Sequence, residues 1–183
     1  MPNTCEDMGL TPDDLVQLTD SYRANMGALR NATLAAKRFS WQMLWTGGPA
    51  TNIGSTKPAP LVRPSTCAAD LRELCQADSP AQTRAMMYSL NGTRDASRIM
   101  KYPNLAKDLA NFLLIRGPYA YLGNGWSGCS NYYPFPDEFN VDYGVPSGLC
   151  KETGSNTGVF VRDFSLSTVQ MDCNTFTPTI TMK

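Results

Sequence analysis

The chain has 183 residues, with 16 Lys and Arg residues balanced by 16 Asp and Glu residues. This length suits about one domain that can bury a core of its own. The even charge argues against a protein that binds the phosphate backbone of nucleic acids, since such proteins normally carry a basic excess. No stretch approaches the roughly 18 consecutive apolar residues of a membrane-spanning helix, so we expect no membrane span.

The sequence contains no histidine. This excludes His-containing catalytic triads and histidine metal sites. Acid–base chemistry near neutral pH would then fall to carboxylates, with Tyr or Lys as alternatives. No CxxC pair is present to suggest zinc. Gly123-Asn124-Gly125 is followed by neither a helix start nor a Lys-Ser/Thr pair, so it does not indicate nucleotide binding. We expect no metal ion and no cofactor.

The number of cysteines is even and their spacing is wide, which is typical of disulfides formed in an oxidising compartment. Connectivity cannot be deduced from spacing alone, and the alternative interpretation is a set of buried free thiols. The pairs that we expect are Cys67–Cys75 across a short helical segment, Cys129–Cys150 around a Pro-rich loop, and Cys5–Cys173 as the remainder.

Two N-glycosylation sequons, at Asn31 and Asn91, also indicate the secretory route. Together with the cysteines they predict a secreted or extracellular glycoprotein. Residues 1–10 show no apolar signal-peptide segment, so we expect the chain not to be a complete precursor.

The first elements in chain order are a long helix and an aromatic strand. Thr11 and Pro12 form a good helix start, and apolar residues then recur at helical spacing, which predicts an amphipathic helix over 12–36. Residues 38–45 (RFSWQMLW) are short, aromatic and apolar, as in a buried strand. Residues 46–64 are rich in Gly and Pro and indicate a long loop.

Further along, the pattern predicts helices over 66–76, 80–90 and 104–115, and then a strand over 119–123. Residues 124–157 show little periodicity and indicate a second long loop. The tail changes character, because 159–164, 168–173 and 175–182 are each typical of extended strands. Strands that alternate with helices imply a parallel sheet. The predicted fold class is therefore α/β, with two parallel strands and a C-terminal antiparallel β segment.

Three segments of the second half resemble the C-terminal end of glycoside-hydrolase-like (β/α)8 barrel proteins of the hypothetical glycosyl hydrolase type. They are LANFLLIRGPYAYLGNGW (109–126), DYGVPSG (142–148) and GVFVRDFSLSTVQMDCNTFTPTI (158–180). The resemblance implies a last helix that leads into the last barrel strand. A loop and a closing β segment with an R-x-F motif then follow, here Arg162-Asp163-Phe164.

The resemblance implies that the chain holds the last third to half of such a barrel. Residues 1–157 would be the C-terminal part of the barrel-like domain, and 158–183 would be its closing antiparallel β segment. The catalytic carboxylates of these families are expected on earlier strands. Glu6 and Asp7, which would follow a missing strand, are the catalytic candidates in this chain. A partial barrel also leaves open sheet edges, which predicts an oligomer or a partner chain that covers them.

Aromatic and amide residues gather where the two predicted parallel strands end. Aromatic rings give rigid apolar platforms for the C–H faces of sugars, and amide side chains bond to hydroxyl groups. The predicted glycan-binding residues are Gln42, Trp45, Tyr121, Asn124 and Trp126. The leading hypothesis is a glycoside-hydrolase-like protein that is incomplete and inactive alone. The alternatives are a disulfide-bonded structural or interaction domain within a larger assembly, and a lectin-like glycan binder.

Overall fold

The structure is a computed structural model that describes residues 9–38, 40–46, 62, 64–90, 93–94, 96–97, 99–123 and 134–183. The chain divides into two compact units, residues 1–40 and 41–183. The first unit consists mainly of one helix, and the second contains the sheets. Among the described residues, no helix is both long enough and apolar enough to cross a membrane.

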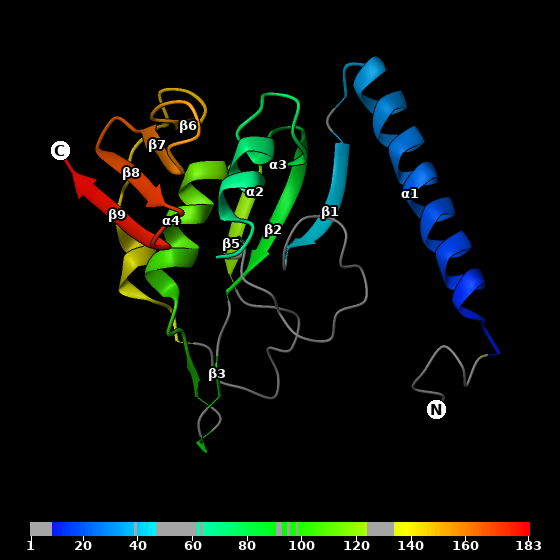
Figure 1. Cartoon of the computed structure of the whole chain (residues 1–183), viewed down its shortest axis with the longest axis horizontal. Helices are drawn as coiled ribbons and strands as arrows, with labels where there is room; N and C mark the ends of the chain where they lie inside the picture. Colours follow the sequence, from blue (N-terminus) through cyan, green and yellow to red (C-terminus); the bar gives the residue numbers. More distant parts are fainter. Residues whose placement is uncertain are drawn as a thin grey trace. The chain divides into compact units, whose positions relative to one another are not determined.

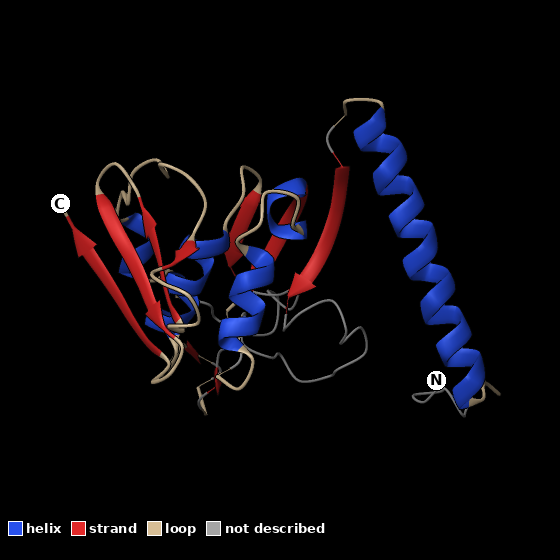
Figure 2. Ribbon diagram, turned by 45° about the horizontal axis from the view of Figure 1, so that its top comes forward, coloured by secondary structure: helices blue, strands red, loops and turns tan. Residues whose placement is uncertain are grey.

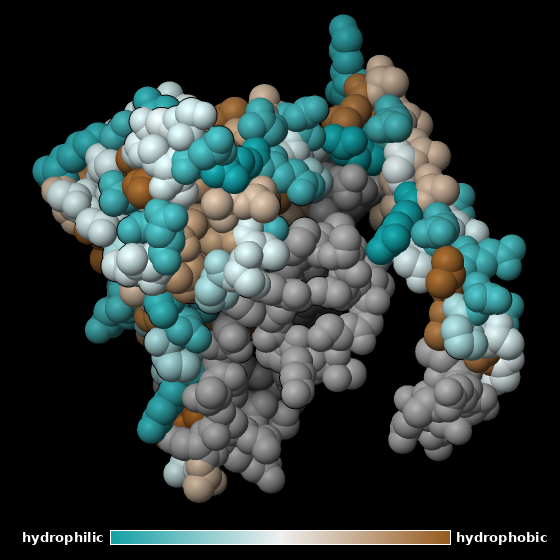
Figure 3. All heavy atoms as spheres, in the orientation of Figure 1, coloured by the Kyte–Doolittle hydropathy of each residue, from teal (hydrophilic) through white to brown (hydrophobic). Residues whose placement is uncertain are grey.

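The first unit contains the predicted long helix, α1 (Pro12–Ala35). Thr11 and Asp14 form a capping box: the Asp14 N–H donates to the Thr11 hydroxyl oxygen, and the Thr11 N–H donates to Asp14 Oδ2 at 2.8 Å. No residue of α1 is buried. Leu18 and Leu29 are each more than half exposed. Figure 3 shows hydrophobic side chains on the surface of this helix. The amphipathic spacing therefore predicted the helix correctly, but the apolar side chains of the helix are not buried.

The second unit contains a three-stranded sheet in the order β1-β2-β5. Its strands are β1 (Ser40–Thr46), β2 (Arg84–Ser89) and β5 (Ala120–Gly123). β2 and β5 run parallel, with Met86 opposite Ala120 and Tyr88 opposite Leu122. A short antiparallel pair, β3 (Thr93–Arg94) and β4 (Met100–Lys101), lies between β2 and β5 in the chain.

Three helices accompany this sheet: α2 (Cys67–Leu74), α3 (Pro80–Thr83) and α4 (Leu105–Ile115). The helix predicted over 80–90 is wrong after Thr83, because the chain continues as β2. Met86 and Tyr88 are buried beside β5. A short apolar run suits a buried helix or a buried strand equally well by periodicity, and here pairing within the sheet decides the outcome. The parallel sheet therefore gains a strand that the sequence pattern did not indicate.

The predicted antiparallel tail is confirmed as a four-stranded sheet in the order β6-β7-β8-β9 (Figure 2). Its strands are β6 (Lys151–Glu152), β7 (Val159–Asp163), β8 (Ser167–Asp172) and β9 (Thr177–Met182). Side chains alternate between the two faces of a strand, so one face of the sheet is buried. That face packs on α4, which contacts β7, β8 and β9 (Figure 1). The 3₁₀ helix η2 (Asp137–Asn140) precedes this sheet.

Two disulfides fasten α2 to the C-terminal sheet. Cys67, at the start of α2, bonds to Cys173 in the β8–β9 turn, and Cys75, at its end, bonds to Cys150 just before β6. The Cα–Cα distances are 5.4 and 5.1 Å. Spacing of four residues places both cysteines on the helix face that also buries Leu71.

The three predicted cysteine pairs are therefore wrong. A Cys67–Cys75 bond is excluded because two turns of helix separate these residues by about 12 Å, well beyond the reach of a disulfide. Cys150 and Cys173 form bonds, but with α2 and not with Cys129 or Cys5. The latter two cysteines lie outside the described residues.

Candidate functional site

The predicted sugar site falls at the carboxyl ends of the parallel strands, and the structure describes part of it. Gln42 and Trp45 lie on β1, and Tyr121 lies on β5. For β1 the structure describes the backbone and not the side chains. Glu6, Asp7, Asn124 and Trp126 are outside the described residues altogether, as is the sequon residue Asn91. The other sequon residue, Asn31, is exposed on α1.

Tyr121 faces away from the core. Its neighbours Ala120 and Leu122 pack against the buried cluster that includes α4. Tyr88, opposite Leu122, meets Phe112 of α4 edge-on with ring centroids 5.5 Å apart. Because side chains alternate along a strand, Tyr121 points to the opposite face of the sheet. It is 59% exposed there.

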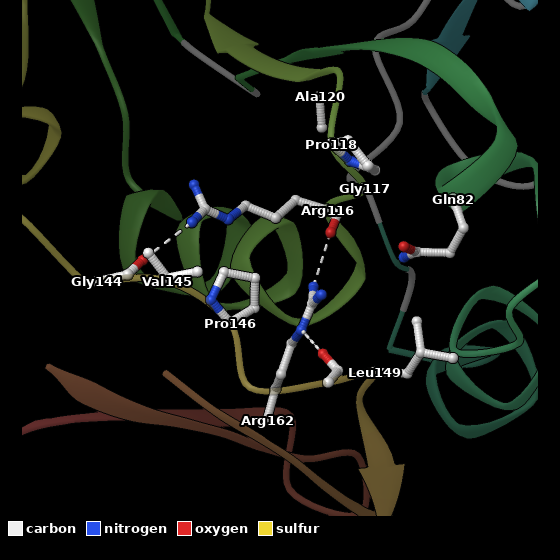
Figure 4. A pocket seen from close by; sticks show the side chains of 11 residues that line it. Gln82, Arg116, Gly117, Pro118, Ala120, Gly144, Val145, Pro146, Leu149 and Arg162 are labelled. Carbon is white, nitrogen blue, oxygen red and sulfur yellow. Dashed lines mark hydrogen bonds between the residues drawn. The ribbon is translucent and has the colours of Figure 1, made fainter. Parts of the chain in front are cut away.

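A second feature, which the sequence pattern did not indicate, is a pocket at the amino ends of the parallel strands (Figure 4). Its volume is about 590 Å³. Its walls are Gln82 before β2, the turn 116–118 before β5, parts of the segment 144–149, and Arg162 of β7. Ala120 of β5 also lines the pocket, whereas Tyr121, the next residue, points to the opposite face of the sheet.

Arg162 is the central residue of this region, although it sits on the buried face of β7 between Phe160 and Phe164 and is 4% exposed. Its Nη1 donates to the carbonyl oxygens of Leu113, Leu114 and Arg116 at 3.1, 2.9 and 2.7 Å. The last carbonyls of a helix have no partner within the helix. Arg162 therefore caps the C-terminus of α4 and places a positive charge where the helix dipole favours one.

Two arginines share this corner of the fold. Arg116 and Arg162 both lie over the ring of Phe164, at 5.2 and 5.5 Å from its centroid. Burial and the charge of Arg116 lower the pKa of Arg162 to about 10. Burial also lowers the pKa of Arg116, whereas the nearby carboxylate of Asp142 opposes that change. Both guanidinium groups stay charged at neutral pH.

Two further acidic residues, Asp142 and Asp172, accept hydrogen bonds from groups close to them in the chain. Asp142 accepts the N–H of Gly144 at 2.9 Å and so supports a turn in which Gly144 adopts a φ of +84°. Asp172 accepts hydrogen bonds from Asn174 and Thr175, which lower its pKa. Among the described residues, no group of three or more His, Cys, Asp or Glu side chains is placed to hold a metal ion.

The sequence was compared with protein-family models and with curated proteins. No protein-family model matches the chain, and no curated protein matches it. The interpretation of function therefore rests on the residues and on the geometry described above.

Proposed function

We propose that the chain is part of a secreted, carbohydrate-active protein of the glycoside-hydrolase-like (β/α)8 barrel type. In this proposal the parallel sheet contributes one section of the barrel wall, and its carboxyl ends contribute to a sugar-binding site. The observation that carries the proposal is the exposed ring of Tyr121 on the face of the sheet that α4 does not cover.

The order of the strands supports a section of barrel. β1, β2 and β5 are neighbours in the same order in which they follow one another along the chain. α4 joins the parallel strands β2 and β5. In a (β/α)8 barrel each strand lies beside its chain neighbour, whereas an open doubly wound sheet reverses its strand order at a switch point. The two disulfides fit the oxidising compartment that a secreted protein meets.

The character of Tyr121 supports sugar binding. An aromatic ring that stands free on a rigid strand loses little entropy when a flat apolar face stacks on it. Gly123, two residues further along β5, lies on the same face and adds no side chain beside the ring. Gln42, Trp45, Asn124 and Trp126 remain the candidates for the rest of this site.

Hydrolysis by this protein stays a prediction from the sequence. It needs two carboxyl groups, about 5–5.5 Å apart for retention of configuration and about 6.5–9.5 Å for inversion. Glu6 and Asp7 remain the candidates in this chain, and a further carboxylate would come from earlier strands.

One observation favours a second candidate function, a structural or interaction domain. α2 is held by a disulfide at each end and by the ion pair between Arg72 and Glu152. Covalent cross-links at both ends of a helix are suited to a domain that has to stay rigid within an assembly. In that case the face of the sheet around Tyr121 would contact a partner chain or another copy of the chain.

Two experiments test the proposed function. The chain is applied to a broad glycan array, and release of reducing sugar is measured on each glycan that binds. Binding with sugar release supports a hydrolase, and binding without release selects the lectin-like function. Failure to bind any glycan contradicts the proposal, and an oligomer or captured partner chain in light scattering would then favour the structural role. Independently, the barrel proposal predicts that the mass of deglycosylated protein from its native source exceeds 20.1 kDa.

A further inference from the structure

The pocket at the amino ends of β2 and β5 has the features of a binding site. The sugar binding proposed above does not involve this pocket. It is open to solvent and has a volume of about 590 Å³. Arg116 reaches it from the end of α4 and Arg162 from β7. Figure 4 shows the Arg162 side chain directed at the carbonyl group of Arg116, and the Arg116 side chain extended toward Gly144.

The charges of Arg116 and Arg162 are not directly paired with a carboxylate of the described residues. In the part of the chain that the structure describes, neither guanidinium group has a carboxylate within ion-pair distance. Among the described residues, none that lines the pocket is acidic. Asp142 influences Arg116 from further away, but its Oδ1 is already bonded to the N–H of Gly144. Two cations in one partly buried corner leave a positive potential that an anion would neutralise.

Both guanidinium groups also keep donors that no described protein atom uses. Arg162 donates through Nε to Gly148 at 2.8 Å and through Nη1 to three carbonyls, which leaves Nη2 without an acceptor among the described residues. Arg116 donates through Nη2 to Gly144 at 3.2 Å, which leaves its Nε and Nη1. A guanidinium group carries five N–H donors in a planar fork, so donors from both arginines remain for a ligand.

The rest of the lining suits a small ligand. Gln82 is oriented by a hydrogen bond from its Nε2 to the carbonyl oxygen of Ile115 at 2.9 Å. The side chain of Arg162 is fixed by its four carbonyl partners before any ligand arrives. Gly117, Gly144 and Gly148 bring backbone rather than bulky side chains to the wall.

We propose that this pocket binds a small oxyanion, a carboxylate or phosphate group, between the unused donors of Arg116 and Arg162. Arginine binds both kinds of group through paired N–H···O bonds, and such charge-assisted bonds are about twice as strong as neutral ones. The site is separate from the proposed sugar-binding surface of Tyr121, because Ala120 lines the pocket and Tyr121, the next residue of β5, points to the opposite face of the sheet.

The test is a titration of the full chain, labelled with ¹⁵N at arginine, followed through the Nε–H resonances. Sodium phosphate is the probe in one arm and sodium succinate in the other, with sodium chloride keeping the ionic strength constant. We expect a saturable shift of the Arg162 Nε–H resonance in at least one arm. The arm with the tighter binding identifies phosphate or carboxylate as the preferred group.

Variants assign the response to the pocket. Arg116→Gln should weaken binding at least tenfold, and Arg116→Lys, which keeps the charge but loses the fork, should weaken it less. Arg23→Gln is the matched control, because Arg23 is an exposed arginine on α1 that pairs with Asp20. It should bind as the wild type does. The proposal is overturned if neither anion gives a saturable shift, or if Arg116→Gln binds as tightly as Arg23→Gln.

Discussion

Arg162 of β7 donates a hydrogen bond of 2.7 Å to the carbonyl oxygen of Arg116, the residue that directly follows α4. Forty-six residues separate the two in sequence. The bond joins the C-terminal sheet to the end of the helix on which it packs. An arginine on the apolar face of a strand is explained by this contact, since the last carbonyl oxygens of a helix have no partner within the helix.

The first prediction concerns this cap. Arg162→Met keeps an apolar stem but leaves the carbonyls of Leu113, Leu114 and Arg116 without their donor. Loss of hydrogen bonds to a buried charged group should lower the free energy of unfolding by about 3 kcal/mol. Urea denaturation measures the change. Arg23→Met, on the exposed surface of α1, should change the stability by less than about 0.5 kcal/mol. Equal stability of the two variants would show that Arg162 is not a structural cap.

The second prediction concerns the disulfides. Peptide mapping without reduction should recover Cys67 linked to Cys173 and Cys75 linked to Cys150. The bonds close loops with sequence separations of 106 and 75, so removing either bond should cost about 2–5 kcal/mol. The smaller loop lies inside the larger, so the two effects should not add. A peptide that links Cys67 to Cys75 would refute the arrangement of α2.

The third prediction concerns acid stability. Arg72 donates to both carboxylate oxygens of Glu152, at 2.8 and 2.9 Å. These bonds, with one from the N–H of Gly158, lower the pKa of Glu152. A carboxyl group whose pKa is lowered by folding contributes stability above its unfolded pKa, and this contribution is lost as the pH falls through the folded value. The melting temperature should therefore begin to fall below pH 4.5.

Glu152→Gln removes this titrating group and gives the matching test. The variant should be less stable at pH 7, and it should lose less stability than the wild type between about pH 5 and pH 3. Glu73→Gln, on α2 but outside the ion pair, should keep the wild-type dependence on pH. A wild-type acid profile in Glu152→Gln would show that the ion pair does not contribute to acid stability.

The fourth prediction concerns a buried hydroxyl group. Tyr88 is 2% exposed and its hydroxyl has no hydrogen-bond partner among the described residues, so burial raises its pKa. Tyr88→Phe removes a desolvated polar group and should leave stability unchanged or raise it by about 1 kcal/mol. Tyr143 is the comparison, because its hydroxyl donates to the carbonyl oxygen of Glu138 at 3.0 Å. Tyr143→Phe should be slightly destabilising, and a larger loss in Tyr88→Phe would contradict the assignment.

Much of the secondary structure followed from local sequence signals. The capping residues before α1, the apolar spacing in α4 and the extended-strand character of 159–164 and 168–173 each placed an element correctly. Local signals failed at 84–89, where methionine and tyrosine suit either a helix or a strand. They failed again for the cysteines, because disulfide partners are chosen by packing between segments that lie far apart in the chain.

The candidate functional residues were harder to predict from the sequence than the secondary structure. Tyr121 could be proposed because aromatic residues near a strand end are a visible pattern. Arg162 was visible within its R-x-F motif, but its role depends on the carbonyl oxygens of α4. The signal available was a charged residue at an inward position between two phenylalanines. Only the fold brings Arg116 to the same place, so the pocket could not be derived from spacing.

The most direct test of sugar binding at the face of the sheet that carries Tyr121 compares two exposed tyrosines. Tyr121 and Tyr22 are 59% and 53% exposed, on β5 and on α1. With the glycan that binds best on an array, Tyr121→Ala should raise the dissociation constant at least about tenfold, the loss of about 1.4 kcal/mol. Tyr22→Ala should bind as the wild type does. Equal affinities of the two variants, or no glycan bound by the wild type, would contradict a sugar site on this face.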